Sequence, residues 1–346
     1  MVQVLDNPWR GAGLGGAGLL PLDDAAGVAA LLAQCPVHRA TPLLDLPELA
    51  ARLGVARLWL KDERGRMGLG SFKALGAAHA IAREAAEGTG DWGQRLAGRV
   101  YVTASAGNHG LSVAAGARVF GARAVIYLAR PVPEGFAARL EAKGAEVRRA
   151  GETYEQSMAA ATAAARDEGA VLLSDSSWPG YTGPALRVME GYLQLAAEAA
   201  AQVEAAPSHI VLQAGVGGLA AAVAAHARRV WGEGPQIIVV EPEVAPALWA
   251  AIRAGHPVET AGPESAMGRL DCKMASMIAL AGLARDADQF VTITEGEALR
   301  AVEEVAVHGL ESTPSGVAGL AALLAGIALP RDARVLAILS EGPEAG

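Results

Sequence analysis

Residues 209–220 read His209-Ile210-Val211-Leu212-Gln213-Ala214-Gly215-Val216-Gly217-Gly218-Leu219-Ala220. The aliphatic and β-branched residues at the start predict a strand, the glycines predict a tight turn, and the alanine-rich continuation predicts a helix. A strand, a glycine turn and a helix in direct succession are typical of the βα units of α/β proteins.

The same rhythm runs along most of the chain. Short apolar runs predict strands at 58–61, 100–103, 124–128, 171–173, 209–212, 237–240 and 334–339. Alanine-rich segments predict helices at 73–87, 133–143, 155–168, 217–230, 245–254, 295–308 and 315–328. Because the apolar runs are continuous and do not alternate, we expect mostly parallel, twisted sheets covered by helices on both faces.

The length of 346 residues favours two lobes over a single core. Residues 78–170 contain a βαβαβ set of their own. We therefore expect a smaller α/β domain at 78–170, inserted into a larger α/β domain made of 1–77 and 171–346.

Composition and charge exclude several classes of protein. The 37 acidic and 29 basic residues give a formal net charge of -8 and form no basic run, so we expect no nucleic-acid partner. Cys35 and Cys272 lie far apart in the sequence, which predicts no metal site, no disulfide scaffold and a reducing cytoplasm. Residues 205–227 carry no charge, but polar residues and glycines interrupt them, so we expect no membrane span. The N-terminal residues lack the early positive charge of a secretory signal.

Lysine is rare in this chain, and one lysine has unusual neighbours. Lys143 precedes a glycine at a predicted helix end, and Lys61 precedes Asp62-Glu63, which predicts a surface ion pair. Lys73 has no other charged residue within six positions on either side. An amine in apolar surroundings can become a Schiff-base nucleophile, because its charged form is disfavoured. The alternative is a structural lysine whose stem lies along apolar surface.

The glycine loop at 213–220 suits a phosphate, because backbone N–H groups at a helix N-terminus bind anions. Gly215-x-Gly217-x-x-Ala220, with Glu241 at the end of the next strand, matches the dinucleotide fingerprint in which the acid binds a ribose. A different phosphate-bearing cofactor competes for the same loop. A tight turn without any ligand is the remaining alternative.

A second loop, Thr103-Ala104-Ser105-Ala106-Gly107-Asn108-His109-Gly110, also lies between a predicted strand and a helix. Its small residues let a flat ring approach the backbone. Asn108 can donate to a ring oxygen, and Ser105 can bind a carboxylate. A dinucleotide enzyme has no use for this loop, whose alternative is a plain turn with Asn108 near the helix cap.

Together with Ser71-Phe72-Lys73, these loops resemble, in the same order, the fold type II pyridoxal-phosphate enzymes, the superfamily of the tryptophan synthase β-subunit. Within that group the chain is most similar to the diaminopropionate ammonia-lyase family, with features of threonine dehydratase. The similarity extends from about Thr41 to Gly342 and includes Gly68-Leu69-Gly70-Ser71-Phe72-Lys73, Asp175-Ser176-Ser177-Trp178-Pro179-Gly180-Tyr181, Met189-Glu190-Gly191-Tyr192, Leu270-Asp271-Cys272 and Ser315-Gly316-Val317.

The resemblance implies pyridoxal 5'-phosphate as the cofactor, held in the larger domain, and a homodimer. The implied cofactor-binding residues are Lys73, Phe72, Asn108, Gly215, Val216, Gly217, Gly218, Leu219 and Ser340. Lys73 would form an imine, the glycine loop would bind the phosphate, and Asn108 would meet the ring hydroxyl. Ser340 would face the pyridine nitrogen, and a neutral partner there weakens the electron sink and favours elimination over transamination. The implied contacts of a small amino-acid substrate are Ser105, Ala106, Gly107 and His109.

Asp175 ends a predicted strand, and the matching aspartate of the lyase family is a candidate for removing the α-proton of an L-substrate. A turn-capping or solvated aspartate is the alternative. The chain departs from that family at Ala106, where the family has an aspartate linked to D-isomers. It departs again after Cys272, where Lys273-Met274-Ala275 replaces Gly-Glu-Pro.

The residues and the resemblance together predict an α,β-elimination that depends on pyridoxal phosphate. The substrate would be an L-amino acid with a β-amino or β-hydroxyl group, such as 2,3-diaminopropionate, and the products a 2-oxo acid and ammonia. A dehydratase for threonine, serine or 3-hydroxyaspartate is the alternative on the same scaffold. An NAD-dependent oxidoreductase and a non-catalytic ligand sensor are more remote alternatives.

Overall fold

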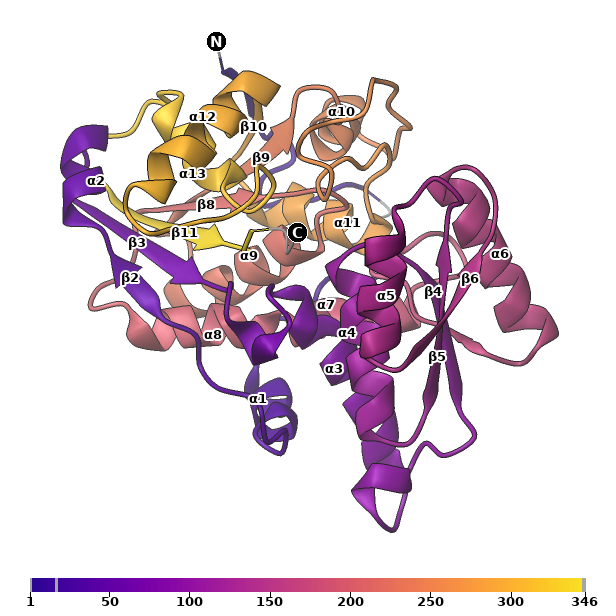
Figure 1. Ribbon diagram of the computed structural model, residues 1–346. Coiled ribbons are helices and arrows are strands. Elements are labelled where there is room, and N and C mark those ends of the chain that lie inside the picture. The colour runs from indigo at the N-terminus through magenta and orange to yellow at the C-terminus, as the bar shows by residue number, and fades with distance from the viewer. Residues whose placement is uncertain (1, 16–17, 344–346) are drawn as a thin grey trace.

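The computed structural model describes residues 2–15 and 18–343. Its larger sheet has the strand order β1-β10-β9-β8-β11-β3-β2 (Figure 1). These strands are β1 Gln3–Asp6, β10 Gln289–Ile293, β9 Gln236–Pro242, β8 His209–Gln213, β11 Arg334–Leu339, β3 Arg57–Asp62 and β2 Leu43–Asp45. The inner pairs are parallel, and only the edge strands β1 and β2 pair antiparallel in this sheet. The expected α/β architecture with mostly parallel sheets is confirmed.

The smaller sheet has four parallel strands in the order β6-β5-β4-β7. They are β4 Val100–Ala104, β5 Arg123–Leu128, β6 Ala145–Arg149 and β7 Val171–Leu172. The sheet thus extends two residues past the predicted boundary at residue 170. The division into domains at 77/78 and 170/171 stays a prediction.

The helices lie on both faces of the sheets, as Figure 1 shows for α12 and α13 on one face of the larger sheet and α8 and α9 on the other. The helices are α1 Ala26–Leu32, α2 Pro47–Leu53, α3 Lys73–Glu87, α4 Asn108–Val119, α5 Glu134–Ala142, α6 Tyr154–Asp167, α7 Gly183–Gly191, α8 Leu193–Gln202, α9 Gly218–Trp231, α10 Ala247–Ala254, α11 Met277–Asp286, α12 Glu295–Ala306 and α13 Ala318–Leu324. Short 3-10 turns occur at Arg66–Gly68 and Trp92–Gln94.

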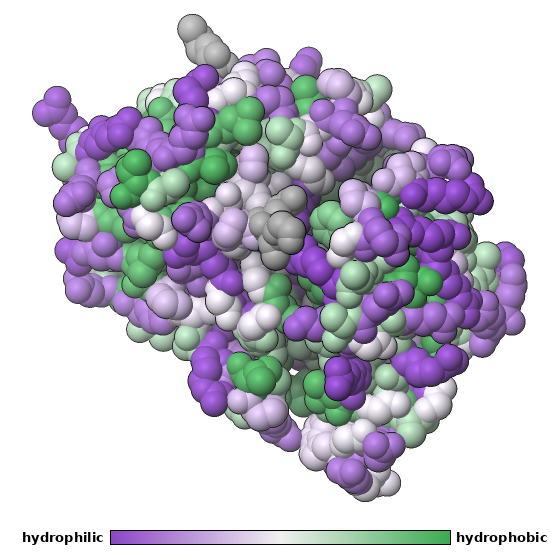
Figure 2. All heavy atoms as spheres, in the orientation of Figure 1, coloured by the Kyte–Doolittle hydropathy of each residue, from purple (hydrophilic) through white to green (hydrophobic). Residues whose placement is uncertain are grey.

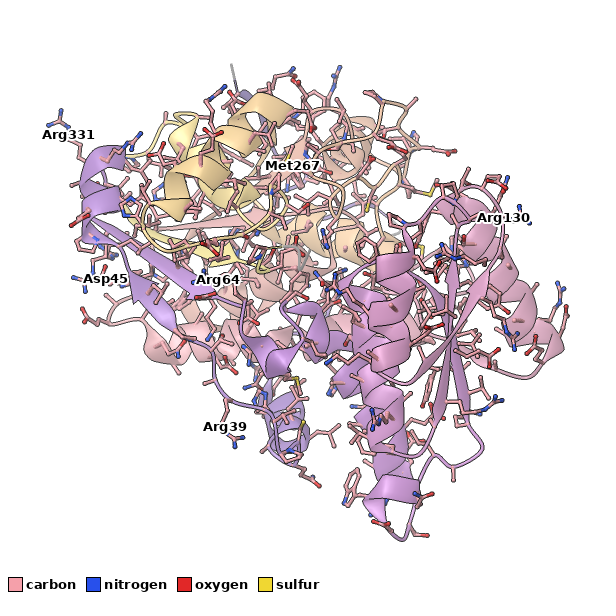
Figure 3. The ribbon with its side chains drawn as sticks, in the orientation of Figure 1. Arg39, Asp45, Arg64, Arg130, Met267 and Arg331 are labelled. Carbon is pink, nitrogen blue, oxygen red and sulfur yellow. The ribbon has the colours of Figure 1, made fainter. Side chains whose placement is uncertain are left out.

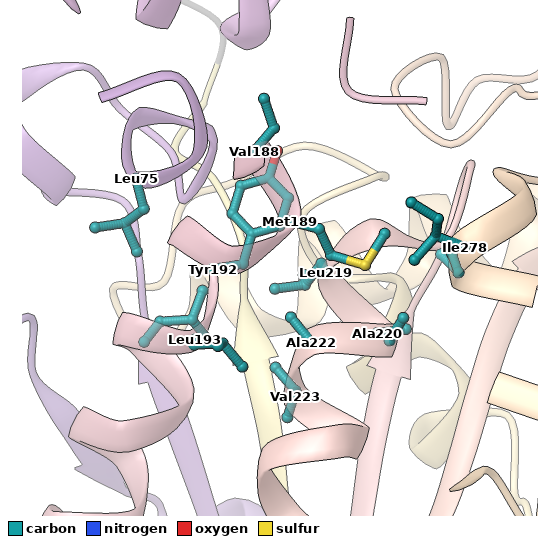
Figure 4. Packing of buried hydrophobic residues seen from close by; sticks show 14 of the residues in the cluster. Leu75, Val188, Met189, Tyr192, Leu193, Leu219, Ala220, Ala222, Val223 and Ile278 are labelled. Atoms are coloured by element: carbon teal, nitrogen blue, oxygen red, sulfur yellow. The ribbon is translucent and has the colours of Figure 1, made fainter. Parts of the chain in front are cut away.

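One buried apolar cluster is continuous from one sheet to the other. It contains Ile126 of the smaller sheet and Ile210 of the larger one, and it includes residues of α3, α7 and α9 such as Leu75, Val188 and Leu219 (Figure 4). Two further clusters cover the outer faces of the two sheets. The two lobes therefore share a core through α3 and α4, and their relative position is fixed by packing.

Glycines allow α3 to lie very close to α7. A Cβ atom on Gly191 would lie 2.5 Å from the carbonyl oxygen of Leu75, and one on Gly76 would lie 2.7 Å from Cε1 of Tyr192. Real Cβ atoms do not approach backbone or ring atoms this closely. These contacts hold the first turn of α3, where Lys73 stands, against the segment around Tyr192.

The apolar pattern did not predict several elements, which include the edge strands β1, β2 and β6 and also the inner strand β10. Strands β1, β2, β6 and β10 and helices α1, α2, α7, α8 and α11 were not predicted as elements. Strand β6 has the sequence AEVRR and is half exposed, so it has no continuous apolar run. Residues 205–227 form β8, the glycine loop and most of α9. No helix in the described part of the chain is long and apolar enough to span a membrane.

Charged side chains cover much of the outer surface, whereas one lysine lies inside. The face in Figure 2 is largely hydrophilic with scattered apolar residues. Exposed arginines such as Arg39, Arg130 and Arg331 point away from the body of the molecule (Figure 3). Lys61, by contrast, is 0% exposed. The prediction that Lys61 forms a surface ion pair with its neighbours is therefore wrong.

Lys61 belongs to a buried charged cluster with Glu63, Arg66 and Glu198. Its Nζ donates to Glu198 Oε2 at 2.8 Å and to the carbonyl oxygen of Thr41 at 2.7 Å. The Arg66 guanidinium donates to both oxygens of Glu198, at 2.9 and 2.7 Å, and to both oxygens of Glu63, each at 2.7 Å. Two cations and two carboxylates balance, as a buried cluster requires.

The cluster controls the ionisation of Glu198. Burial alone would raise the pKa of this carboxyl group, but the hydrogen bonds and charges of Arg66 and Lys61 lower it to about 2. Because the folded pKa lies below the ordinary value of 4.5, ionised Glu198 stabilises the fold above about pH 4.5. That contribution is lost as the pH falls from 4.5 towards 2.

We expect the E198Q variant to lower the free energy of unfolding at neutral pH by about 3 kcal/mol or more, because it leaves buried cations without their anion. Urea unfolding measures this change. The control is E204Q, which removes an exposed partner of Arg57 and should cost less than about 1 kcal/mol. Equal stability of the two variants would contradict the assignment, as would a stability gap between E198Q and the wild type that does not shrink below about pH 4.5.

Candidate active site

The predicted site segments converge at one edge of the larger sheet. Strands β8 and β11 are parallel neighbours, so the loop after Gln213 and residue Ser340 follow strand ends on the same edge. The backbone N–H of Phe72 donates to the carbonyl oxygen of Ser340 at 3.1 Å, and Ser71 pairs with Glu341 in an isolated bridge. The segment before Lys73 is therefore fixed to the end of β11. Crevices outside the carboxyl ends of parallel strands are the usual ligand sites of such sheets.

Lys73 forms a charged hydrogen bond with Asp175. The Lys73 Nζ donates to Asp175 Oδ2, and the two side chains are 21% and 17% exposed. Burial alone would favour the neutral form of each group, but their mutual attraction is stronger. The pKa of Asp175 therefore lies below its ordinary value and that of Lys73 above it. The pair joins the first residue of α3 to the loop after β7 of the smaller sheet.

The loop that contains Ser105, Ala106 and Gly107 ends at the first residue of α4, Asn108, and all four are partly buried. The hydroxyl of Ser105 accepts a hydrogen bond from the backbone N–H of Gly107 at 3.2 Å. The amide of Asn108 donates to Glu341 Oε2. The loop therefore reaches from the smaller sheet to the end of β11.

His109 is turned into the protein. It is 5% exposed, and its Nε2 donates to the carbonyl oxygen of Leu173 at 2.8 Å. Burial lowers the pKa of the ring, which favours the neutral form. The ring supports the backbone two residues before Asp175.

The glycine loop is enclosed by the segment 269–272. A Cβ on Gly215 would lie 3.0 Å from Cys272 Sγ and 3.1 Å from the Cα of Leu270. Gly217 has φ +96, and its Cβ would lie 3.0 Å from side-chain atoms of two further residues. Val216 follows in the same turn, and Gly218 and Leu219 open α9, so the N–H groups of a helix N-terminus gather at this loop.

Residues that the sequence did not single out complete the site. Glu341 is 4% exposed, accepts hydrogen bonds from the Asn108 amide and Thr313 Oγ1, and forms an ion pair with Arg269, whose Nε lies 3.1 Å from Glu341 Oε2. The only sequence feature that could have pointed to Glu341 is its position directly after Ser340, which is also 4% exposed. Burial, and then the charge of Asp175, raise the pKa of the Cys272 thiol to about 12, so Cys272 stays protonated.

Tyr154, at the start of α6, and Tyr192, between α7 and α8, also border the Lys73–Asp175 pair. Burial and the charge of Asp175 raise the pKa of the Tyr192 phenol, whereas the side chain of Tyr154 is exposed to solvent. The hydroxyl of Tyr192 is buried and has no hydrogen-bond partner among the described residues. Lys273, the other departure in this region, binds Asp271 and the carbonyl oxygens of Val244 and Pro263 and so fixes its own loop.

The dinucleotide-binding alternative requires an accessible acidic residue at Glu241, and the structure does not provide one. Glu241 is 0% exposed, and its two oxygens accept from the backbone N–H groups of Leu248 and Trp249 at 2.8 and 2.7 Å. Burial raises its pKa to about 8. Glu241 therefore caps α10 and offers no exposed oxygen to a ribose, so its expected role in that alternative is wrong.

The residues present fit a flat cofactor that carries a phosphate. Lys73 is paired with Asp175, whose carbonyl oxygen would lie 4.0 Å from a Cβ on Gly218 at the end of the glycine loop. The space that a Cβ on Gly215 would fill is lined by backbone, and the buried hydroxyl of Tyr192 has no partner among the described residues. Such a set provides an amine for a covalent bond, an anion site and a carboxylate beside the amine.

Comparisons with known proteins agree with this geometry. The sequence model of the family "Pyridoxal-phosphate dependent enzyme" matches residues 35–341. The diaminopropionate ammonia-lyase of Salmonella typhimurium is 34% identical over 265 residues, which cover 70% of this chain and 66%, just under two thirds, of that protein. The one from Escherichia coli K12 is 31% identical over 344 residues, 88% of this chain and 85% of that protein.

A solved structure has the same fold over almost the whole chain. It is the Escherichia coli diaminopropionate ammonia-lyase in complex with an aminoacrylate-PLP azomethine reaction intermediate, with a TM-score of 0.87 and 28% identity. The match covers 99% of this chain and 94% of that one.

We expect the G215A variant to bind pyridoxal phosphate at least about tenfold more weakly, because its methyl group would displace the 269–272 segment, and such overpacking costs about 1–3 kcal/mol. Titration of the cofactor-free protein with pyridoxal phosphate measures the affinity. Gly135 lies in α5 with no atom within 4 Å of its Cβ position, so G135A is the matched control and should leave the affinity unchanged. Equal affinities of the two variants would contradict the enclosed loop.

Proposed function

Because the chain belongs to the pyridoxal-phosphate dependent enzymes, we propose that it removes a β-amino or β-hydroxyl group from a small L-amino acid such as 2,3-diaminopropionate. The β-group leaves as ammonia or water, and hydrolysis of the released enamine by one water gives a 2-oxo acid and ammonia. The proposal is supported by the likeness to diaminopropionate ammonia-lyases over most of the chain. The observation that carries it is the pairing of Lys73 with Asp175, since an elimination needs an amine and a base side by side.

The residues that hold the cofactor in this proposal surround Lys73. Lys73 forms the covalent bond, Phe72 lies beside it, and the N–H groups of Gly215, Val216, Gly217, Gly218 and Leu219 bind the phosphate. Asn108 donates to the ring hydroxyl, and Ser340 faces the ring nitrogen. When bound, pyridoxal phosphate supplies an electron sink for the bond that breaks at the α-carbon.

Asp175 takes the α-proton of the substrate. Its Oδ2 is hydrogen-bonded to Nζ of Lys73, so any atom bonded to Nζ lies within short reach of that oxygen. The charge of Lys73 holds the pKa of Asp175 down. When Nζ is engaged and its charge is lost, the proton affinity of the carboxylate rises, and Asp175 becomes a stronger base. Once the substrate has displaced the Lys73 amine from the cofactor, that amine is a second group that can accept the α-proton.

The loop with Ser105, Ala106 and Gly107 binds the substrate carboxylate through its hydroxyl and backbone N–H groups. His109, expected from the sequence to contact the substrate, is 5% exposed and holds the backbone at Leu173, two residues before Asp175. Ala106 provides no carboxylate that could remove a proton on the opposite face, so we expect D-isomers to react slowly.

The same residues could bind a substrate with a β-hydroxyl group. The sequence of the 105–107 loop also resembles that of threonine dehydratase. Serine, threonine and 3-hydroxyaspartate are therefore the second candidates. We further propose a homodimer, which the resemblance implies, and a cytoplasmic location, which the free thiols of Cys35 and Cys272 favour.

The test is release of ammonia and 2-oxo acid from diaminopropionate, serine, threonine and 3-hydroxyaspartate in both stereochemical series. We expect turnover of an L-isomer, and a kcat about 10²- to 10⁴-fold lower in the D175N variant, which keeps the shape but loses the base. The control is D167N, which changes an exposed aspartate at the end of α6 and should match the wild type. Binding of these amino acids without release of ammonia would identify a ligand sensor and contradict the proposal.

A further inference from the structure

The hydroxyl of Tyr192 is an unused polar group beside the site. Tyr192 is 1% exposed, and no described residue accepts or donates a hydrogen bond at its hydroxyl. A buried polar group without a partner is costly, and a phenylalanine ring would fill the same space without that cost. The Tyr192 hydroxyl therefore requires a hydrogen-bond partner that the described residues do not supply.

The ring of Tyr192 lies between the two elements that would hold the cofactor. A Cβ on Gly76, three residues after Lys73 in α3, would lie 2.7 Å from its Cε1. A Cβ on Gly218, the first residue of α9, would lie 3.5 Å from its Cε2. The ring centroids of Tyr192 and Phe72 are 4.9 Å apart. Figure 4 shows the ring beside Met189 and near Leu219 at the start of α9.

The charges around Tyr192 keep its proton in place. Burial raises the pKa of the phenol, the charge of Lys73 opposes this rise, and the charge of Asp175 supports it, with a net shift upward. The hydroxyl is therefore protonated at neutral pH, and it can donate a hydrogen bond to an anion.

We propose that Tyr192 is a further cofactor-binding residue, whose hydroxyl donates a hydrogen bond to the phosphate of pyridoxal phosphate. The phosphate is the anionic part of the cofactor, and the N–H groups that suit it belong to the loop against which the ring packs. Donation to a charged acceptor is stronger than donation to a neutral one. The inference rests on the cofactor of the proposed function, and it needs neither the substrate nor the reaction.

The test uses Y192F, which removes only the hydroxyl. We expect its affinity for pyridoxal phosphate, measured by titrating the cofactor-free protein, to fall by about 10- to 100-fold, as for the loss of a hydrogen bond to a charged group. Its affinity for pyridoxal, which lacks the phosphate, should stay within about twofold of the wild type. The cofactor-free Y192F protein should unfold at the same urea concentration as the wild type or a higher one, because the removed hydroxyl has no partner there.

Tyr101 provides the matched control. It is also 1% exposed, but its hydroxyl donates to Glu84 Oε2 at 2.7 Å. Y101F should therefore lower the stability of the cofactor-free protein and leave the affinity for pyridoxal phosphate unchanged.

Two results would overturn the proposal. The first is a Y192F affinity for pyridoxal phosphate within about twofold of the wild type, and the second is an equal loss for pyridoxal phosphate and pyridoxal. A wild type that binds the cofactor as expected but releases no ammonia contradicts only the proposed elimination.

Discussion

The charged hydrogen bond between Lys73 and Asp175 connects the two lobes at the point where the chemistry is proposed. Lys73 begins α3, which packs against α4 and α7, and Asp175 follows β7 of the smaller sheet. Each charge is buried enough to be unfavourable alone, so each depends on the other. This contact thereby holds the amine beside its carboxylate, at the junction where the shared apolar core packs the two sheets together.

Close packing around the Lys73–Asp175 pair restricts several nearby positions to glycine. Gly76 and Gly191 let α3 approach α7, and Gly215 lies under the 269–272 segment. Glu341 gathers Asn108, Thr313 and Arg269 at the end of β11. These constraints lie on different segments but meet at one edge of the larger sheet. The same edge therefore provides rigid support for a lysine, an anion site and a ring.

The strand and helix pattern, the glycine loop and Lys73 could all be predicted from local sequence, because each has a signature within a few residues. Lys73 stood out through the absence of nearby charge, and α9 through its glycine turn and alanines. Partners distant in sequence could not be predicted. Lys61 meets Glu198, which lies 137 residues away, and Asn108 meets Glu341, 233 residues away. The local sequence around Lys61 predicted a surface ion pair with its neighbours Asp62 and Glu63, and this prediction is wrong.

The half-exposed edge strand β6 was not predicted from the sequence for a related reason. Strand β6 carries Arg148 and Arg149, whose charged ends reach solvent, so its sequence lacks a strand-like apolar run. The position of Tyr192 depends on two glycines that lie on different helices. No local rule reports such an arrangement, because it arises only when the helices pack.

The central claim is that Lys73, among the four lysines, holds pyridoxal phosphate. Reduction of the purified protein with borohydride, followed by mass spectrometry of its peptides, locates a lysine that carries the cofactor as an imine. We expect the pyridoxyl group on the peptide that contains Lys73 and on no peptide of the K73A variant. A label on Lys61, Lys143 or Lys273, or no label in the wild type saturated with pyridoxal phosphate, would contradict the account.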